Sequence, residues 1–309
     1  MRSIVIGSRG SRLALWQAEW LRDRLAGAGH AARIEVIHTS GDRFLDQPLA
    51  SMGGRGVFVK EIEEALLARS VDVAAHSLKD LPTAQPDGLA IACVPERDDP
   101  RDVLLAPGNP GLSGLRPGAV VGTGSPRRAC QIRAHRTDVT IRDLRGNVDT
   151  RLARLRAGDY DAILLASAGL RRLGIEFEGT RLDFDLMLPA VGQGAMAIET
   201  RVEDRDLRQW LRPFHHEATA IAVGAERALL RGLGGGCQAP IAALGEVQGG
   251  RLRLRALVAG PDGLPLLRDR REGDVGMAED MARDMAEGLL ARGAAALVSQ
   301  GTAAPPDAP

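Results

Sequence analysis

Along the first two thirds of the chain, short apolar runs alternate with segments whose apolar residues follow a helical period. Six runs have the length and composition of buried strands: residues 3–6, 34–38, 71–75, 119–121, 139–142 and 162–165. In the first helical segment the apolar residues recur at helical spacing and would share one face of the helix: Leu13, Trp16, Trp20, Leu21 and Leu25. This alternation predicts an α/β fold built on mainly parallel sheet.

Two distant segments, 4–11 and 120–128, share one construction. Each runs from an apolar strand through a turn of Gly and Ser residues that carries Arg, and then into a helix. In the second segment, Ser125 suits the N-cap of the helix and Pro126 its first turn. Such a turn directs backbone N–H groups and the positive helix end at one point, where a carboxylate or phosphate binds. We therefore expect two α/β lobes that face a shared anionic ligand.

Polar stretches closed by proline or glycine, at 95–100 and 189–194, mark the borders of these lobes. Beyond them, a helical pattern and three strand-like runs separated by Gly-containing turns predict a small α+β domain with a three-stranded antiparallel sheet. The expected division of the chain is residues 1–96 plus 195–213 for the first lobe, 100–189 for the second, 216–300 for the third domain and 301–309 for a disordered tail.

Composition excludes several classes of protein. With 44% hydrophobic residues, 26% charged residues and zero net charge, the chain is typical of soluble globular proteins. Its aromatic residues are only five Phe, three Trp and one Tyr, too few for nucleic-acid recognition by stacked rings. No apolar stretch approaches the roughly 18 residues of a membrane span, and the N-terminal run, broken at Gly7, is too short for a signal peptide. We expect a cytoplasmic protein that binds neither nucleic acid nor membrane.

The three cysteines lie far apart and form no Cys-x-x-Cys pair, which argues against a zinc site and a disulfide framework. Cys93 and Cys130 fall in a strand-like run and a helical segment, where structural roles are expected. Cys237 ends a glycine-rich run that leaves its thiol little steric cover, as a covalent attachment point requires. The alternative is a small buried residue in a flexible loop. We expect no metal, because His215 and His216 have no partners at ligand spacing and instead suit packing or capping.

The segment 72–82 ends an apolar strand with His76, Ser77, Lys79 and Asp80. Polar groups at the carboxyl end of a parallel strand are where α/β proteins place their ligands. Asp80 suits a general acid or a group that stabilises a developing cation, and Lys79 suits a partner for a ligand carboxylate. A solvated strand end with an ion pair remains the alternative.

Residues 120–198 are basic, with 12 Lys or Arg against 9 Asp or Glu. Guanidinium groups bind carboxylates through paired hydrogen bonds, so several Arg near one cleft suit a polycarboxylate. The candidates are Arg127, Arg128, Arg145, Arg151, Arg154, Arg156, Arg171 and Arg172. At least half are expected to be ordinary surface charges, above all Arg154 and Arg156, because Leu152 and Leu155 beside them have the pattern of a buried face.

Several ordered motifs together resemble one known family, the porphobilinogen deaminases, over essentially the whole chain. The motifs are Ser-Arg-Gly-Ser at 8–11, Leu-Ala-Leu-Trp-Gln at 13–17, His-Ser-Leu-Lys-Asp-Leu-Pro at 76–82, Gly-Thr-Gly-Ser-Pro-Arg-Arg at 122–128, Leu-Arg-Gly-Asn-Val-Asp-Thr-Arg at 144–151, Leu-Pro-Ala-Val-Gly-Gln-Gly at 188–194, His-His-Glu at 215–217 and Gly-Gly-Cys-Gln-Ala-Pro at 235–240. The resemblance implies two lobes like those of periplasmic binding proteins around a cleft, with a small C-terminal α+β domain.

The activity that this resemblance implies is the joining of four porphobilinogen molecules, with release of ammonia, into the linear tetrapyrrole hydroxymethylbilane of haem biosynthesis. A covalent dipyrromethane cofactor, one per chain, would be attached through a thioether to Cys237, and Asp80 would act at the reacting pyrroles. The resemblance also implies a monomer and a transient transfer of product to uroporphyrinogen III synthase.

Carried over motif by motif, the resemblance also assigns residues to the binding of cofactor and substrate. Porphobilinogen carries an acetate and a propionate on its ring, which accounts for the supply of cations. The residues are Arg9, Ser11, Gln17, Arg55, Phe58, Ser77, Lys79, Thr123, Ser125, Arg127, Arg128, Arg145, Gly146, Arg151, Arg172 and Gln193.

Two other classes of protein fit parts of the pattern. A two-lobed carboxylate-binding protein without catalysis would use the same anion-binding helix ends, but it leaves Cys237 unexplained. A ligand-sensing regulatory domain would need a DNA-reading segment, and no helix-turn-helix pattern is recognisable.

Overall fold

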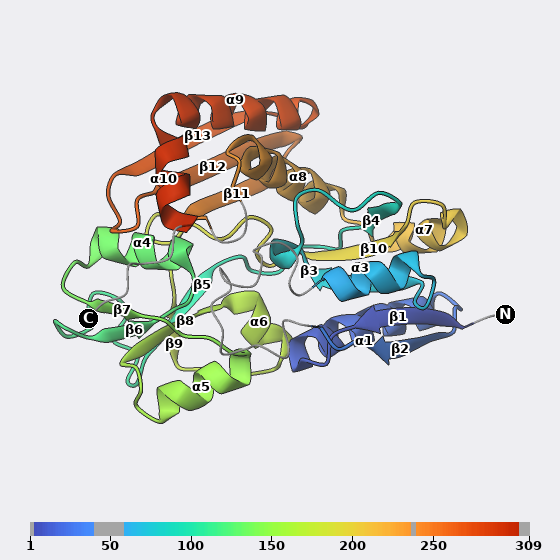
Figure 1. Ribbon diagram of the computed structural model, residues 1–309, viewed down its shortest axis with the longest axis horizontal. Helices are drawn as coiled ribbons and strands as arrows, with labels where there is room; N and C mark the ends of the chain where they lie inside the picture. Colours follow the sequence, from blue (N-terminus) through green and yellow to red (C-terminus); the bar gives the residue numbers. More distant parts are fainter. Residues whose placement is uncertain (1–2, 40–58, 236–238, 303–309) are drawn as a thin grey trace.

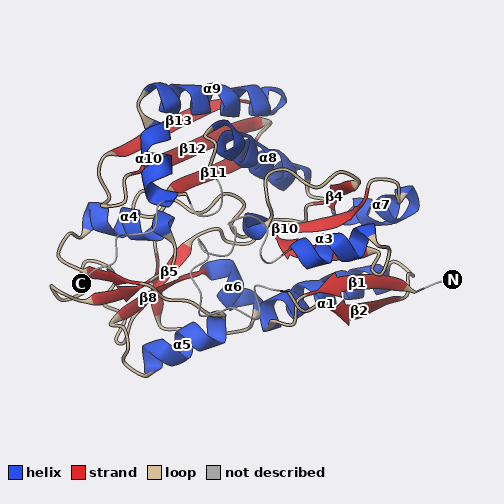
Figure 2. Ribbon diagram, viewed as in Figure 1, coloured by secondary structure: helices blue, strands red, loops and turns tan. Residues whose placement is uncertain are grey.

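The chain forms three sheets with associated helices (Figures 1 and 2). The structure, a computed structural model, describes residues 3–39, 59–235 and 239–302. The first two sheets lie side by side, and the third lies against both of them. We call the first two sheets, with their helices, lobe 1 and lobe 2, and the third the C-terminal domain.

Lobe 1 is a five-stranded sheet in the order β2-β1-β3-β10-β4. Ser11 caps its first helix by accepting a hydrogen bond from the N–H of Ala14, and the helix buries Leu21 and Leu25 against the sheet. The elements are β1 (Ile4–Ser8), α1 (Arg12–Gly27), β2 (Ala32–Val36), α3 (Lys60–Leu67), β3 (Val73–Ser77), a 3-10 turn (Leu78–Asp80), β4 (Leu89–Cys93), β10 (Met196–Arg201), α7 (Arg205–Leu211) and a 3-10 turn (Arg212–Phe214).

Lobe 2 is a second five-stranded sheet, in the order β7-β6-β8-β5-β9. As expected, Ser125 caps the helix after β6 by accepting from the N–H of Arg128, and Pro126 occupies its first position. The elements are β5 (Asp102–Leu105), β6 (Val120–Gly122), α4 (Pro126–His135), β7 (Thr140–Arg142), α5 (Val148–Arg156), β8 (Ala162–Ala166), α6 (Ser167–Arg172) and β9 (Gly179–Arg181).

Both sheets are mixed, which corrects the expectation of mainly parallel sheet. Strand β1 pairs in parallel with β2 and β3, and β6 with β7 and β8. However, β10 pairs antiparallel with β3 and β4, and β5 pairs antiparallel with β8 and β9. The physical reason is the path of the chain, because β10 enters the sheet of lobe 1 from the opposite end after the chain returns from lobe 2. All six expected runs overlap an observed strand.

The C-terminal domain is a three-stranded antiparallel sheet, as expected, in the order β11-β12-β13. Leu252 and Leu254 of β12 face the helices, whereas Leu257 packs with Cys130 and Leu188 of lobe 2. The elements are α8 (Glu217–Gly232), β11 (Ile241–Gln248), β12 (Arg251–Ala259), β13 (Leu266–Asp274), a 3-10 turn (Val275–Met277), α9 (Ala278–Ala291) and α10 (Ala294–Thr302).

The helix α10 is not predicted by the sequence, and its last residues overlap the expected tail of 301–309. The rest of that tail lies outside the described residues. The division of the chain into independent domains stays a prediction. Among the helices of the described ranges, none is both long and apolar enough to cross a membrane.

Candidate active site

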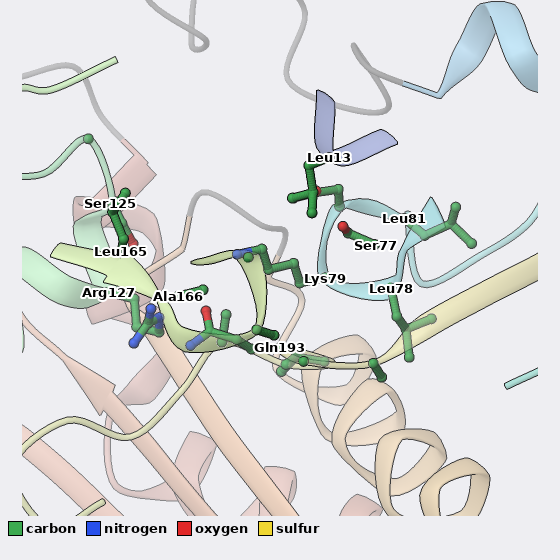
Figure 3. Close-up of a pocket in the computed structure, with 18 of the residues that line it drawn as sticks. Leu13, Ser77, Leu78, Lys79, Leu81, Ser125, Arg127, Leu165, Ala166 and Gln193 are labelled. Carbon is green, nitrogen blue, oxygen red and sulfur yellow. The ribbon is translucent and has the colours of Figure 1, made fainter. Parts of the chain in front are cut away.

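A cavity of about 1000 Å³ lies where lobe 1, lobe 2 and the C-terminal domain meet. Figure 3 shows Ser77 and Lys79 of lobe 1 on one side and Ser125 and Arg127 of lobe 2 on the other, with Gln193 between them. Its volume is at the upper end of the roughly 300–1,000 Å³ that is usual for small-molecule sites. The cavity therefore has room for a ligand larger than one pyrrole ring.

The charge of the lining is strongly positive. Among the described residues, ten Lys or Arg line the cavity against two Asp, Asp80 and Asp149. The cations are Arg9, Arg12, Lys79, Arg127, Arg128, Arg145, Arg151, Arg172, Arg227 and Arg231. Such a lining suits a ligand with several negative charges.

The carboxyl end of β3 supplies three polar side chains to this cavity. Ser77 ends the strand and accepts a hydrogen bond from Gln17 Nε2 over 2.8 Å. The following 3-10 turn carries Lys79 and leaves Asp80 exposed at the cavity. Burial lowers the pKa of Lys79 to about 8, although the negative charge of Asp80 opposes this shift. Lys79 can therefore lose its proton within the ordinary working range of pH.

The turn after β6 aims the start of α4 at the same cavity. Thr123 Oγ1 accepts from the N–H of Ser125 over 3.1 Å, and Ser125 then caps the helix. Arg127 and Arg128 follow in the first turn of α4, with side chains only 4% and 6% exposed. Both guanidinium groups form ion pairs with the buried carboxylate of Asp102, which the sequence does not single out.

The turn between β7 and α5 supplies Arg145, and the start of α5 supplies Arg151. Gly146 in this turn has φ of +102°, and a Cβ there would lie 2.9 Å from Thr150 Cβ, so the position requires glycine. Arg151 Nε donates to the carbonyl of Gly146 over 2.8 Å, which fixes the guanidinium against the turn. Burial lowers the pKa of Arg151 to about 10, and the nearby Arg128 contributes to the shift.

Gln193 lies in a segment that crosses between the lobes, and Arg172, at the end of α6, bonds to the same segment. Arg172 Nη2 donates to the carbonyl of Gly194 over 2.6 Å, and burial lowers the pKa of its guanidinium. Gln193 Nε2 donates to the carbonyl of Pro100 over 2.7 Å, and this bond joins the two crossing segments. These two side chains therefore attach the cavity wall to the junction of the lobes.

The C-terminal domain adds two arginines that the sequence analysis missed. Arg227 Nη2 and Nη1 of α8 donate to the carbonyls of Pro82 and Leu81, over 2.6 and 3.2 Å, just after Asp80. Burial lowers the pKa of Arg227 to about 10. Arg231 lies one turn further along the same helix and also lines the cavity. Their position could have identified them, because both are cations on the helical segment that leads into the Cys237 segment.

Most of the residues proposed from the sequence lie together in the cavity lining. Gln17 and Thr123 do not line it, but each bonds a residue that does. Arg55, Phe58 and Cys237 lie outside the described residues. The residues in the lining are Arg9, Ser11, Ser77, Lys79, Asp80, Ser125, Arg127, Arg128, Arg145, Gly146, Arg151, Arg172 and Gln193.

Several residues expected outside the site are outside it. Arg154 and Arg156 are exposed, and Arg154 pairs with Asp159. Cys93 and Cys130 are buried free thiols, and burial raises the pKa of each, to about 12 and about 11. His216 caps α8 by accepting from the N–H of Thr219.

Comparison with known families decides the identity of the chain. The family model for the porphobilinogen deaminase dipyrromethane cofactor binding domain matches residues 4–209, and the model for the porphobilinogen deaminase C-terminal domain matches 220–291. The chain belongs to the porphobilinogen deaminase family. As a member of this family it is a transferase of tetrapyrrole biosynthesis with porphobilinogen deaminase activity, and its first two lobes form the dipyrromethane cofactor binding domain.

A relative with high sequence identity agrees with this assignment. The porphobilinogen deaminase of Geobacillus kaustophilus (strain HTA426) is 49% identical over 304 residues, which cover 97% of this chain and 98% of the relative. Among solved structures, a periplasmic substrate-binding protein of an ABC transporter from Coxiella burnetii is 15% identical over 70% of this chain and 93% of its own, with a TM-score of 0.44. A nutrient-binding protein from Burkholderia cenocepacia bound to methionine has a TM-score of 0.42 at 12% identity, over 68% of this chain and 90% of its own. At such TM-scores neither likeness bears on function.

Proposed function

We propose that this porphobilinogen deaminase family member couples four porphobilinogen molecules head to tail on a dipyrromethane attached through a thioether to Cys237. Four porphobilinogen molecules and one water give hydroxymethylbilane and four molecules of ammonia. Asp80 is the catalytic carboxylate. The observation that carries the proposal is one cavity in which Asp80, ten cationic side chains and both borders of the Cys237 segment come together.

The cavity lining fits a dipyrromethane with its carboxylate side chains. Gly235 and Ala239, the described residues that border the Cys237 segment, both line the cavity. A thioether at Cys237 would therefore begin at the wall that also carries Arg227 and Arg231. The guanidinium groups of lobe 2 would hold the carboxylates through paired hydrogen bonds. When bound, the dipyrromethane supplies the free pyrrole position from which the chain is extended.

Asp80 would act on the reacting pyrroles by charge and by hydrogen bonding. Its carboxylate accepts from pyrrole N–H groups and stabilises the positive charge that develops on porphobilinogen as ammonia leaves. The carboxylate is placed in advance, because the 3-10 turn follows the buried strand β3 and the N–H of Leu78 bonds the carbonyl of Ala195. One such preorganised contact is worth about 3–4 kcal/mol of transition-state stabilisation.

The cations around Asp80 would bind and orient the substrate. Lys79 and Arg9 line the cavity from lobe 1, and Arg127, Arg128 and Arg151 line it from lobe 2. Because each added ring brings two more carboxylates, a lining with ten cations suits a lengthening polyanion better than it suits a single amino acid. This excess of charge favours the polymerising enzyme over a two-lobed protein that only binds a carboxylate.

The intact mass of the denatured protein tests the proposal, with the wild type beside Cys237→Ser. We expect the wild type to carry the mass of two linked pyrrole units, and the variant to carry none. Cys130→Ser is the matched control, because Cys130 is a buried thiol away from the cavity, and it should keep the adduct. A wild type that lacks the adduct and gains none with porphobilinogen, and that releases no ammonia, would support the binding protein instead.

The resemblance to the family extends to finer features of the function. It implies a monomer, and light scattering at working concentration measures this. Hydroxymethylbilane cyclises spontaneously to uroporphyrinogen I, so we infer that the product is transferred to uroporphyrinogen III synthase. A trapping experiment with that enzyme would detect the transfer as a rise in isomer III.

Buried free thiols at Cys93 and Cys130 support a reducing, cytoplasmic location, and cell fractionation tests it.

A further inference from the structure

Asp102, the first residue of β5, is a fully buried carboxylate behind the cavity wall. Its exposed fraction is 0%. Oδ2 accepts from Arg127 Nη1 over 2.7 Å, and Oδ1 accepts from Arg128 Nη2 and Nε over 2.7 and 3.0 Å. Gln193 Nε2 also donates to Oδ1, over 3.0 Å. One carboxylate thus holds three side chains that all line the cavity.

Backbone acceptors complete the fixation of the two guanidinium groups. Arg127 Nη1 also donates to the carbonyl of Leu188 over 2.8 Å, and Arg128 Nη1 donates to the carbonyl of Leu164 over 2.9 Å. Within the described part of the chain, Nε and Nη2 of Arg127 donate to no protein acceptor. Since Arg127 lines the cavity, these N–H groups are available to a ligand carboxylate.

The charges in this cluster explain why a carboxylate is needed there. Two adjacent guanidinium groups with side chains 4% and 6% exposed repel each other in a poorly hydrated site. Burial raises the pKa of Asp102, but the two guanidinium groups outweigh it and hold the pKa well below its usual range. Asp102 therefore stays ionised and leaves the cluster with one net positive charge.

We propose that Asp102 is a positioning residue for the reaction, which holds Arg127 and Arg128 in the orientation that binds the carboxylates of porphobilinogen. The inference rests on the proposed function, because it requires these arginines to contact the substrate. Asp102 itself does not contact the substrate and acts only through the two guanidinium groups.

Four proteins test this role: wild type, Asp102→Asn, Arg128→Gln and the double variant. KM and kcat are measured on chains whose intact mass shows the bound cofactor. Mass spectra at increasing porphobilinogen also give a half-loading concentration, at which half of the chains have gained one unit. We expect Asp102→Asn to raise KM and this half-loading concentration by about tenfold or more, with kcat changed by less than about threefold. The double variant should raise KM by less than the product of the single effects, because both changes act on one contact.

Each pattern of results has one meaning. A wild-type KM in Asp102→Asn together with a raised KM in Arg128→Gln overturns the positioning role and leaves the proposed function intact. A wild-type KM in both variants overturns the proposed binding of substrate by these arginines. Single effects that multiply fully in the double variant also overturn the inference, since Asp102 would then act independently of Arg128.

A second substitution keeps the test decisive if Asp102→Asn does not fold. Asp102→Glu keeps the charge but displaces the carboxylate by one methylene, so a positioning role predicts a KM raised by about threefold or more. A wild-type KM in a folded Asp102→Glu would show that only the charge matters, and would overturn the proposal. The matched control is Asp72→Asn, in lobe 1 away from the cavity. It weakens the ion pair of Asp72 with Arg201, whose side chain is 7% exposed, and it should leave KM unchanged.

Discussion

The Arg97 guanidinium donates to both oxygens of the Glu226 carboxylate, over 2.6 and 3.3 Å, and the Glu226 side chain has no exposed surface. The same carboxylate accepts from the N–H of Gly192 over 2.7 Å and from the N–H of Gly245 over 2.8 Å. Arg97 and Gly192 belong to the two segments that cross between the lobes, and Gly245 belongs to β11. One buried ion pair therefore joins both crossing segments to the C-terminal domain.

Removal of the charge at Glu226 should destabilise this junction. Glu226→Gln leaves the Arg97 guanidinium buried without its counter-ion, which typically lowers the free energy of unfolding by about 3–5 kcal/mol. Urea unfolding followed by circular dichroism measures the change. Glu279→Gln, in an exposed pair with Arg231, is the control and should change the free energy by less than about 1 kcal/mol. Equal effects from both variants would show that the buried pair adds nothing to stability.

Asp80→Asn should keep the fold and lose most of the turnover. The amide has the same size but cannot stabilise the developing positive charge, so we expect kcat to fall by about 10²–10³-fold. Release of ammonia from porphobilinogen gives the rate, and the thermal midpoint shows whether the fold is kept. Asp87→Asn changes an exposed carboxylate of the same lobe and should leave the rate unchanged. A folded Asp80→Asn with a near-normal rate would reduce Asp80 to a minor role.

Local sequence patterns predict the parts of the site that one segment builds. Ser11 and Ser125 are recognisable as helix caps because a cap depends only on the residue and the turn that follows it. Lys79 and Asp80 are recognisable because they directly follow an apolar strand. The resemblance to the family then adds roles for these residues that no local pattern contains.

Contacts between distant segments are not predictable in this way. Arg97 and Glu226 are 129 positions apart, and neither has a neighbour in sequence that marks it as half of a pair.

The strand β10 is not predicted from the sequence for a related reason. Its residues Glu199, Thr200 and Arg201 are polar yet buried, so the strand has no continuous apolar pattern, and only tertiary contacts decide its place.

The low pKa of Lys79 predicts a change in substrate binding above neutral pH. Burial lowers this pKa to about 8, so the ammonium group loses its proton as the pH rises through 8, and its attraction for a carboxylate is lost. We expect kcat/KM, which reports groups of the free enzyme, to fall above pH 8 in the wild type. Lys79→Arg stays charged over this range and should have a flatter profile between pH 7 and 9.5, whatever its absolute rate. Identical profiles in the two proteins would exclude Lys79 as the titrating group.

Arg151 and Arg154 lie one turn apart on α5 and should differ sharply in effect. Arg151 lines the cavity, whereas Arg154 is exposed and pairs with Asp159. A charge-assisted hydrogen bond contributes about 1.5–3 kcal/mol, so Arg151→Ala should lower kcat/KM by about 10–100-fold and stall elongation or cofactor loading. Arg154→Ala should do neither. Intact mass after a short exposure to porphobilinogen shows how many units each variant has added, and equal distributions would remove Arg151 from the binding site.

Glu63 should make stability depend on pH in the direction opposite to an ordinary salt-bridged carboxylate. Burial, followed by the charge of Glu199, raises its pKa from 4.5 to about 7, and its buried Oε1 has no hydrogen-bond partner among the residues that the structure describes. Between pH 4.5 and 7 the folded state holds more protons than the unfolded state, so the free energy of unfolding falls as the pH rises through this window, by roughly 1–3 kcal/mol. Glu63→Gln cannot titrate, so its free energy of unfolding should fall less than that of the wild type between pH 4.5 and 8, as measured by urea unfolding. Glu64 is exposed on the same helix, and Glu64→Gln should show the same fall as the wild type. If Glu63→Gln and the wild type lose equal stability over that range, Glu63 is not the group that makes stability depend on pH there.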